Sequence, residues 1–407
     1  MRGLTRQSEA YLPATERTGR RSSDRNGAPR IAVACSGLGH VQRGIEAWAT
    51  DLARGLRQVG IEVTLFAGTT MDGAEALPCL HRTARINKLL SAMFRQLGGW
   101  RYGVGSPYEV EQTSFAVALW SRIRRGYDIV HVQDPTLACW LQWASRHGLS
   151  SARVLYANGT GEGPAVMGHF RYLQFLTRGT HDVWLQNAQT KQRAFIVPNF
   201  VDTRQFSPGD QQEARAAFGL PRDATIILCC AAIRRPHKRI DYLLQEYRHA
   251  TQQSDQPVML VVAGGRETDT ESIIVEGTAL LTDQVRFLPD LPRRLMPELY
   301  RTADVFVLPS LHEMFGIVLL EAMASGLPVL CHDAPDFRAI CGHSALYRDL
   351  SVAGGLASGL NVLLHPKARA ERAALSRPHV VQHFSERVVI PDILAMYDTV
   401  METRSHG

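Results

Sequence analysis

The chain has 407 residues, of which 45% are hydrophobic and 21% are charged, a balance that is typical of a globular protein. This length indicates two or three domains. No apolar run reaches the roughly 18 residues that a membrane-spanning helix needs, and the first residues lack the apolar stretch of a secretory signal. We therefore expect a cytoplasmic protein whose contact with a membrane, if any, is peripheral.

The net charge of +6 is concentrated in the first thirty residues. That stretch holds seven arginines against Glu9, Glu16 and Asp24, which amounts to +4 and leaves +2 for the rest of the chain. The basic balance therefore belongs to a polar tail, residues 1–29, that we expect to be disordered. It gives no reason to expect a nucleic-acid partner.

The first predicted domain, residues 30–197, opens with a β-α-β pattern. An apolar strand at 30–35 leads into a glycine-containing loop, a helix with one apolar face runs from about 44 to 59, and a strand follows at 62–67. Such a unit begins a doubly wound parallel sheet. The loop lacks the third glycine of a dinucleotide-binding motif, because Gln42 stands at that place.

A basic amphipathic segment follows at residues 83–97. Its apolar side chains recur at helical spacing, and arginines and a lysine lie between them. Such a helix can lie on an anionic membrane, or it can turn its apolar face into the core of the domain. We favour the second interpretation and keep the membrane as the alternative.

A later strand, residues 128–132, ends at Gln133, where we expect the edge of a cleft. His131 alternates to the other side of this strand, so we expect it to be a buried structural residue.

Residues 198–210, with a proline near each end, form a predicted linker. A second series of strands and helices fills residues 211–385, and a final helix occupies residues 386–405. The two halves predict an α/β protein made of two Rossmann-like, doubly wound domains.

The stretch around Glu313 and Glu321 carries the strongest functional signal. A buried strand at 305–308 leads into a loop with Glu313, and the helix that follows carries Glu321. Free N–H groups at a helix start suit a phosphate, and a carboxylate just before the helix can accept hydrogen bonds from sugar hydroxyls. Glu321 lies roughly 7.5 Å further along the helix, a distance that suits a ribose. The turn that opens the helix consists of Phe315, Gly316 and Ile317.

A basic cluster lies between an earlier strand and helix of the same predicted sheet. It contains Arg234, Arg235 and Lys238, and cations at the carboxyl end of a strand can neutralise a diphosphate. The next strand ends at Gly264 and Gly265, where a nucleotide can approach the backbone closely. A plain turn explains these two glycines equally well.

The chain resembles the retaining family-4 glycosyltransferases of the GT-B class over about residues 30–405. Glu313 and Glu321 match the E-x7-E motif of that family, and Lys238 matches the lysine of its donor motif, although the arginine of that motif falls on Ala232. The resemblance implies two facing domains with a cleft between them, and a last helix that crosses back onto the first domain.

The resemblance is looser in the N-terminal domain. Gly44 alone fits the family's Gly-Gly loop, Arg43 replaces the first glycine, and Gly39 widens the same loop. Gln133 stands where many members have a histidine near the reacting sugar; its amide can donate a hydrogen bond but cannot relay a proton. The resemblance implies binding of the donor through Glu321, Phe315, Gly316, Ile317, Gly264, Gly265, Gly44 and Gly39, and catalysis through Glu313, Lys238, Arg234, Arg235 and Gln133.

The implied reaction moves a sugar from a nucleotide-diphosphate-sugar donor to an acceptor hydroxyl with retention of configuration. The acceptor attacks on the face that the diphosphate leaves, and the leaving phosphate takes the proton, so no protein nucleophile is needed. We expect neither a metal nor a cofactor, because Lys238, a neighbouring arginine and a helix dipole take the place of a cation. The acceptor stays open among a lipid, a saccharide and a small molecule.

Two other classes of protein fit the same fold. A pseudo-enzyme would bind a sugar nucleotide without turnover, which Ala232 and Gln133 favour and the intact Glu313, Glu321 and Lys238 oppose. A sugar-nucleotide epimerase or a phosphorylase is the other alternative, and a phosphorylase would bind pyridoxal phosphate through a Schiff-base lysine.

Overall fold

The computed structural model describes residues 29–41, 43–188, 191–252 and 256–402. The predicted tail, residues 1–29, lies outside these ranges except for its last residue, Pro29. Across the described ranges, no helix is both long enough and apolar enough to cross a bilayer.

The N-terminal half forms a parallel sheet, in which the described strands take the order β3-β2-β1-β4-β5-β6-β7. The central strand β1 is buried along its whole length, as expected for a parallel sheet that is covered on both faces. Its register pairs Ile31 with Val63 on one side and with Ile129 on the other. The strands are β1 (Ile31–Cys35), β2 (Val63–Ala67), β3 (Glu75–Ala76), β4 (Ile129–Val132), β5 (Arg153–Ala157), β6 (Tyr172–Phe175) and β7 (Arg193–Ile196).

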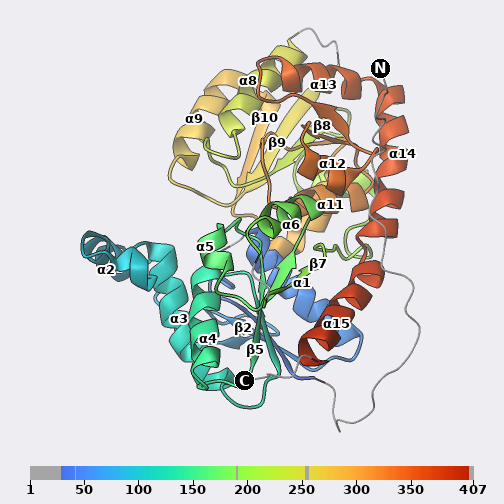
Figure 1. The fold of residues 1–407 in the computed structure, drawn as a ribbon. Coiled ribbons are helices and arrows are strands. Elements are labelled where there is room, and N and C mark those ends of the chain that lie inside the picture. The colour runs from blue at the N-terminus through green and yellow to red at the C-terminus, as the bar shows by residue number, and fades with distance from the viewer. Residues whose placement is uncertain (1–28, 42, 189–190, 253–255, 403–407) are drawn as a thin grey trace, which may run out of the picture.

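Helices cover both faces of this sheet (Figure 1). One core joins α1 and the C-terminal helix α15 (Glu386–Glu402) to alternate residues of β1, and a second core joins α3 and α4 to the residues between them. The α3 helix begins where Ser106 accepts a hydrogen bond from the Glu109 amide at 3.2 Å. The helices are α1 (Gly44–Gln58), α2 (Arg85–Gln96), η1 (Gly99–Tyr102), α3 (Pro107–Ile123), α4 (Pro135–Arg146), α5 (Pro164–Met167) and α6 (Arg178–Leu185).

The C-terminal half forms a second parallel sheet, with the described strands in the order β10-β9-β8-β11-β12-β13. The strands are β8 (Thr225–Cys230), β9 (Val258–Gly264), β10 (Val285–Pro289), β11 (Val305–Val307), β12 (Val329–His332) and β13 (Leu346–Arg348). One face packs against α8, α9 and α13, and the other against α10, α11, α12 and α14. The helices and 3₁₀ turns are α7 (Gln211–Ala217), α8 (Ile240–Thr251), α9 (Thr270–Leu281), η2 (Thr282–Gln284), η3 (Arg293–Leu295), α10 (Met296–Thr302), α11 (Ile317–Ala324), α12 (Pro335–Cys341), α13 (Gly355–Leu364) and α14 (Pro366–His383).

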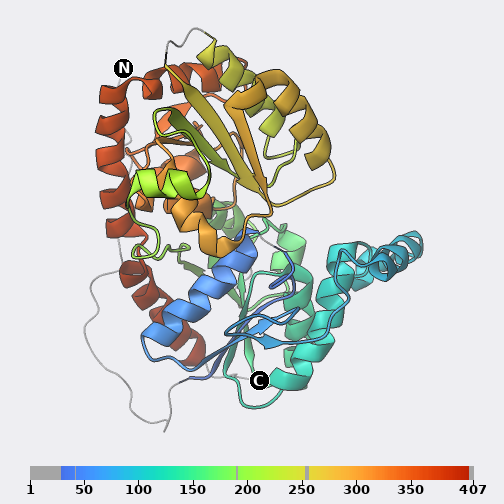
Figure 2. The same ribbon diagram turned by 180° about the vertical axis from the view of Figure 1, so that it is seen from behind.

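The chain crosses between the two halves twice, and the crossings lie side by side. The Val201 amide donates to the Phe384 carbonyl at 3.0 Å, just before the last helix, α15 (Glu386–Glu402), begins. This helix packs on the N-terminal sheet (Figures 1 and 2). The predicted α/β architecture of two doubly wound, Rossmann-like domains is confirmed.

His131 is fully buried, as its place in the strand predicts, and its Nδ1 lies 2.8 Å from the hydroxyl of Tyr397 on α15. Burial lowers the pKa of His131 to about 3, so the ring is neutral at physiological pH. The pair therefore fixes α15 to the sheet by a buried, uncharged hydrogen bond.

The favoured interpretation of residues 83–97 is wrong. The face of α2 that meets the domain carries Asn87 and Ser91, and the Asn87 amide donates to the carbonyls of Leu80 and Pro107 at 2.6 and 3.0 Å. Because these polar contacts fix the rotation of the helix, most of its apolar side chains point to solvent. In both views α2 projects away from the body of the domain (Figures 1 and 2).

Replacing Tyr397 by phenylalanine should lower the free energy of unfolding by about 1–3 kcal/mol, because the buried imidazole would lose its partner. Urea unfolding followed by circular dichroism measures the change. Asp398→Asn, at an exposed position on the same helix, is the control. Equal midpoints for Tyr397→Phe and the native chain would contradict the importance of this bond.

Candidate functional site

An ion pair between Lys238 and Glu313 lies at the carboxyl ends of two neighbouring strands. β8 and β11 pair side by side in the sheet, and each leads into the loop that carries one partner. The Lys238 ammonium donates to Oε1 of Glu313, and their side chains are only 19% and 10% exposed. The structure thus brings together two predicted residues that lie 75 positions apart in sequence.

The backbone around Lys238 is unusual, because His237 and Arg239 both have positive φ, at 70° and 50°. The left-handed backbone of Arg239 is a conformation that favours glycine. The Arg239 guanidinium donates to the Leu350 carbonyl at 2.6 Å and lies 3.9 Å from the centre of the Tyr242 ring. These contacts hold a strained loop in place just before α8.

The turn that opens α11 requires glycine. Gly316 has a φ of 69°, and a Cβ added there would lie 3.0 Å from Cδ1 of Leu319. Phe315 is buried and packs edge-on against Phe384, so its side chain belongs to the core. Ile317, also buried, is the first residue of the helix. In the first turn, the Leu319 amide donates to the Gly316 carbonyl at 2.9 Å. The amides of Ile317 and Val318, which precede it, are therefore the groups here that suit an anion.

Glu321 is fully buried and both of its oxygens are engaged. Oε1 accepts from Arg293 at 2.5 Å, and Oε2 accepts from the hydroxyl of Tyr300 at 2.8 Å. Burial raises the pKa of Glu321, against the effect of Arg293. Arg293 also donates to Asp51 at 3.1 Å. Since Asp51 belongs to α1, a single guanidinium joins the predicted ribose-binding carboxylate to the other domain.

The other predicted cations point elsewhere. Arg234 donates to the nearby Pro236 carbonyl at 2.8 Å, and Arg235 pairs with Glu276 of α9 at 2.6 Å. Neither arginine contacts Glu313 in the described part of the chain. The basic cluster therefore divides, with only Lys238 reaching the carboxylate at the strand ends.

The two glycines at the end of β9, Gly264 and Gly265, let neighbouring backbone segments approach closely. A Cβ at Gly264 would overlap the Ala231 carbonyl, and the Gly265 carbonyl accepts from the Ile233 amide at 3.0 Å. The absence of a side chain at Gly264 therefore lets β9 approach the end of β8.

Loops of the N-terminal domain approach the Glu313 loop. Gln133 is 2% exposed, its Nε2 has no partner among the described residues, and it lies so near Gly159 that a Cβ there would overlap its amide. Two residues further on, a Cβ at Gly161 would lie 2.9 Å from the sulfur of Met314, the neighbour of Glu313. Gln133 therefore lies near the place where the N-terminal domain meets the Glu313 loop.

The first loop of the chain also reaches the other domain. Arg43 pairs with Glu267, in the loop after β9, at 2.9 Å. Gly44 begins α1, and a Cβ added there would meet no atom within 4 Å. Gly39 has a φ of 96° and a Cβ there would lie 2.5 Å from a Thr69 methyl, so it shapes the loop. Open space therefore adjoins Gly44.

Sequence reasoning missed a cluster of acids beneath this loop. Glu111 of α3 accepts from Arg82 at 2.5 Å and lies 2.9 Å from Nε2 of His40. Burial opposes the charge of Glu111, but the hydrogen bonds from His40 and Arg82 lower its pKa to about 2. Nearby Glu46 has an unpartnered Oε2 among the described residues, and burial, then Asp134, raises its pKa to about 7. No sequence motif joins these residues, which lie on separate elements.

The missed residues around Glu321 are Arg293, Tyr300 and Asp51. Arg293 and Tyr300 flank the start of α10, where the sequence shows no periodic or motif signal for a site. In the described ranges, no three His, Cys, Asp or Glu side chains lie so as to hold a metal ion.

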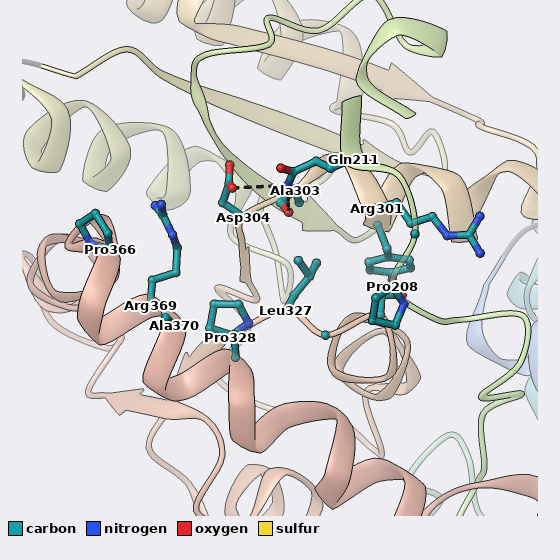
Figure 3. Close-up of a pocket in the computed structure, with 15 residues that line it drawn as sticks. Pro208, Gln211, Arg301, Ala303, Asp304, Leu327, Pro328, Pro366, Arg369 and Ala370 are labelled. Carbon is teal, nitrogen blue, oxygen red and sulfur yellow. Dashed lines mark hydrogen bonds between the residues drawn. The ribbon is translucent and has the colours of Figure 1, made fainter. Parts of the chain in front are cut away.

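A hollow with a volume of about 380 Å³ lies at the amino ends of strands of the C-terminal sheet, away from the Lys238–Glu313 pair (Figure 3). Asp304, which precedes β11, and Arg369 of α14 border it. The Asp304 carboxylate is already bound by Arg215 at 2.7 Å. Because ligands of such sheets bind outside the carboxyl ends of the strands, this hollow is not the candidate site.

Two Rossmann-like domains with parallel sheets, joined by a last helix that packs back on the first domain, are the architecture of the GT-B class of proteins. Residues 42–205 match the family model described as Glycosyltransferase Family 4, and residues 210–364 match that of Glycosyl transferases group 1. The chain belongs to this family of glycosyltransferases, which confirms the resemblance carried by Glu313 and Glu321.

Several named proteins are similar to this chain. It is 34% identical over 205 residues to a D-inositol 3-phosphate glycosyltransferase of Geodermatophilus obscurus, over 48% of this chain and 43% of that protein. It is 25% identical over 402 residues to a phosphatidyl-myo-inositol mannosyltransferase of Mycobacterium leprae, over 92% and 98% of the two chains. The chain spans half or less of the length of the inositol-phosphate relatives.

Solved structures share the fold at low identity. A sucrose-phosphate synthase from Thermosynechococcus elongatus superposes with a TM-score of 0.70 at 20% identity, over 91% of this chain and 99% of that one. The Anabaena protein HepE in complex with UDP-glucose gives 0.67 at 15% identity, over 92% and 100%. These likenesses support the fold.

Glu46→Gln should flatten the dependence of stability on pH. Folded Glu46 keeps its proton up to about pH 7, whereas the unfolded group ionises near 4.5, so the native free energy of unfolding should fall as pH rises between these values. The loss of free energy of unfolding that this difference in pKa causes amounts to about 3 kcal/mol at pH 8, relative to a pH below both values. Urea unfolding at pH 5 and pH 8 tests this, with the exposed Glu371→Gln as control. An unchanged pH dependence in Glu46→Gln would exclude Glu46 as the titrating group.

Proposed function

We propose that this chain transfers a sugar from a nucleotide-diphosphate sugar to an acceptor hydroxyl, with retention of configuration and without a metal ion or a cofactor. The observation that carries the proposal is the Lys238–Glu313 pair beside the N-terminal turn of α11. A cation, a carboxylate and free amides at one point complement a diphosphate joined to a sugar.

Binding of the donor would replace the contact between Lys238 and Glu313 by contacts between each of these residues and the donor. Lys238 would turn from Glu313 to the diphosphate, and Glu313 would then accept hydrogen bonds from hydroxyls of the sugar. The amides of Ile317 and its neighbour would donate to the same diphosphate. The complex of HepE with UDP-glucose makes a uridine nucleotide the first donor to test.

Ribose binding at Glu321 requires a rearrangement, because this carboxylate has no exposed surface. A carboxylate can accept about four hydrogen bonds, so ribose hydroxyls can join Glu321 once Arg293 moves aside. Arg293 also holds Asp51 of the N-terminal domain. Nucleotide binding would therefore be coupled to a change at the domain boundary.

The transfer step needs positioning and charge more than a nucleophile. The acceptor oxygen would bond to the anomeric carbon on the face where the carbon–oxygen bond to the diphosphate breaks. The bonding electrons would leave with the diphosphate, and one of its oxygens would take the acceptor proton. Lys238 and the start of α11 would stabilise the charge that grows there. Gln133, with its free amide, would donate to a sugar hydroxyl.

The acceptor would enter from the N-terminal domain, near Gly44 and Gly39. Two relatives are named for inositol-containing acceptors, which makes a cyclic polyol the first class to test, beside saccharides and lipids. A GT-B binding module without turnover is the second candidate, because Gln133 is not a proton relay and Ala232 stands at the place of the arginine in the donor motif.

Calorimetry with UDP, GDP, ADP and TDP should find saturable binding of one nucleotide in the absence of metal. Glu321→Gln should weaken that binding by about 10- to 100-fold, since one charge-assisted hydrogen-bond acceptor is lost. Glu371→Gln is the matched control, and circular dichroism checks that each variant folds. If the folded native chain binds none of the nucleotides, the donor site is wrong.

Lys238→Met should lower the release of nucleoside diphosphate from the bound sugar nucleotide by at least about 100-fold, because charge developing on the leaving group would lose its cation. Exposed Lys367→Met should leave the rate unchanged. The product anomer, measured by nuclear magnetic resonance, tests retention, and a chelator tests metal independence. Nucleotide binding without any release, with water or acceptors, would favour the binding module.

A further inference from the structure

The segment from α2 through η1, residues 85–102, forms a projection whose apolar side chains are unusually exposed. We call it the α2 projection. In both views it extends away from the N-terminal sheet (Figures 1 and 2). Six of its large apolar side chains are between 50% and 74% exposed: Ile86, Leu89, Met93, Leu97, Trp100 and Tyr102.

The orientation of α2 is the reverse of that expected for a helix that covers a core. Such a helix buries its apolar stripe and exposes its polar face. Here Asn87 and Ser91 are buried, while Ile86, Leu89 and Met93 recur at three- and four-residue intervals on the solvent side. A contiguous exposed apolar stripe of this kind marks an interaction surface.

The charge of the projection indicates what that surface binds. The α2 projection contains four arginines and lysines and no acid. Of these four, Arg85, Lys88 and Arg101 are exposed and have no acidic neighbour within the projection. On an ideal helix, Arg85 lies beside the apolar stripe, whereas Lys88 lies toward the opposite side of the helix. Apolar side chains flanked by cations, with an exposed Trp and Tyr, complement the boundary of an anionic bilayer.

We propose that the α2 projection docks this protein on an anionic membrane surface, with its apolar stripe in the acyl boundary and its cations against lipid phosphates. A second copy of the chain fits less well, because two acid-free projections placed face to face would bring like charges together. The proposal does not depend on the reaction proposed above.

The position of the projection also relates the membrane to the site. Arg82, at its base, is held by Glu111, which in turn contacts His40 in the loop after β1. Docking through α2 would therefore hold the N-terminal half of the site near the bilayer, where an acceptor carried by a lipid would be found.

Flotation of the full-length chain with lipid vesicles tests the proposal. We expect binding to vesicles of phosphatidylcholine with about one third phosphatidylglycerol, and at least tenfold weaker binding to phosphatidylcholine alone. The variant L89S/M93S/L97S should lose binding at least tenfold, and R85E/K88E should lose it selectively on anionic vesicles. The control is Val275→Ser, at an equally exposed apolar position on α9 of the other domain.

Absence of vesicle binding by the native chain, or equal binding by the native chain and L89S/M93S/L97S, would overturn the proposal. So would a native dimer in analytical ultracentrifugation that this variant converts to monomer, since the stripe would then cover a second copy. Nucleotide binding by the same variant should be unchanged. Failure of the donor site and failure of the membrane contact are therefore distinguished by separate measurements.

Discussion

The guanidinium of Arg293 is the interaction on which the boundary between the two domains depends. It donates to Glu321 of the C-terminal domain and to Asp51 of the N-terminal domain, and both carboxylates are almost completely buried. A buried carboxylate is costly without a partner. Separating the domains would leave one of the two acids without this cation. The relative position of the domains and the ionisation of Glu321 are therefore energetically coupled. A ligand that donates hydrogen bonds to Glu321 would therefore affect both the contact of Arg293 with Glu321 and its contact with Asp51.

The part of the site that could be predicted from the sequence is the part that is local in the chain. Strand β11, the Glu313 loop, Gly316 and helix α11 form one continuous stretch, so spacing alone indicates which groups share the carboxyl end of the sheet. His131 was predictable for the same reason, because alternation along a strand decides which face a side chain takes. The doubly wound fold follows from the repeated order of strands and helices.

The rest depends on tertiary contacts that spacing does not encode. Arg293 and Asp51 are 242 residues apart, and no motif relates them. Arg235 sits in the predicted basic cluster, yet its partner Glu276 lies on another helix. Periodicity revealed that α2 is amphipathic, but its rotation was decided by two carbonyls that accept from Asn87. A sequence pattern shows that a helix has an apolar face and does not show which side of it the domain covers.

The loop that carries Lys238 shows how a departure from a local rule is compensated. Non-glycine residues with positive φ cost of the order of 1–3 kcal/mol each, and two of them flank this lysine. Arg239 offsets that cost through the Leu350 carbonyl and the Tyr242 ring, contacts that a glycine at this position would lack. The same contacts restrict the backbone of the loop. The Lys238 ammonium is therefore held near Glu313 with little loss of conformational entropy. Strain held by neighbouring packing thus preorganises the cation on which the proposed chemistry relies.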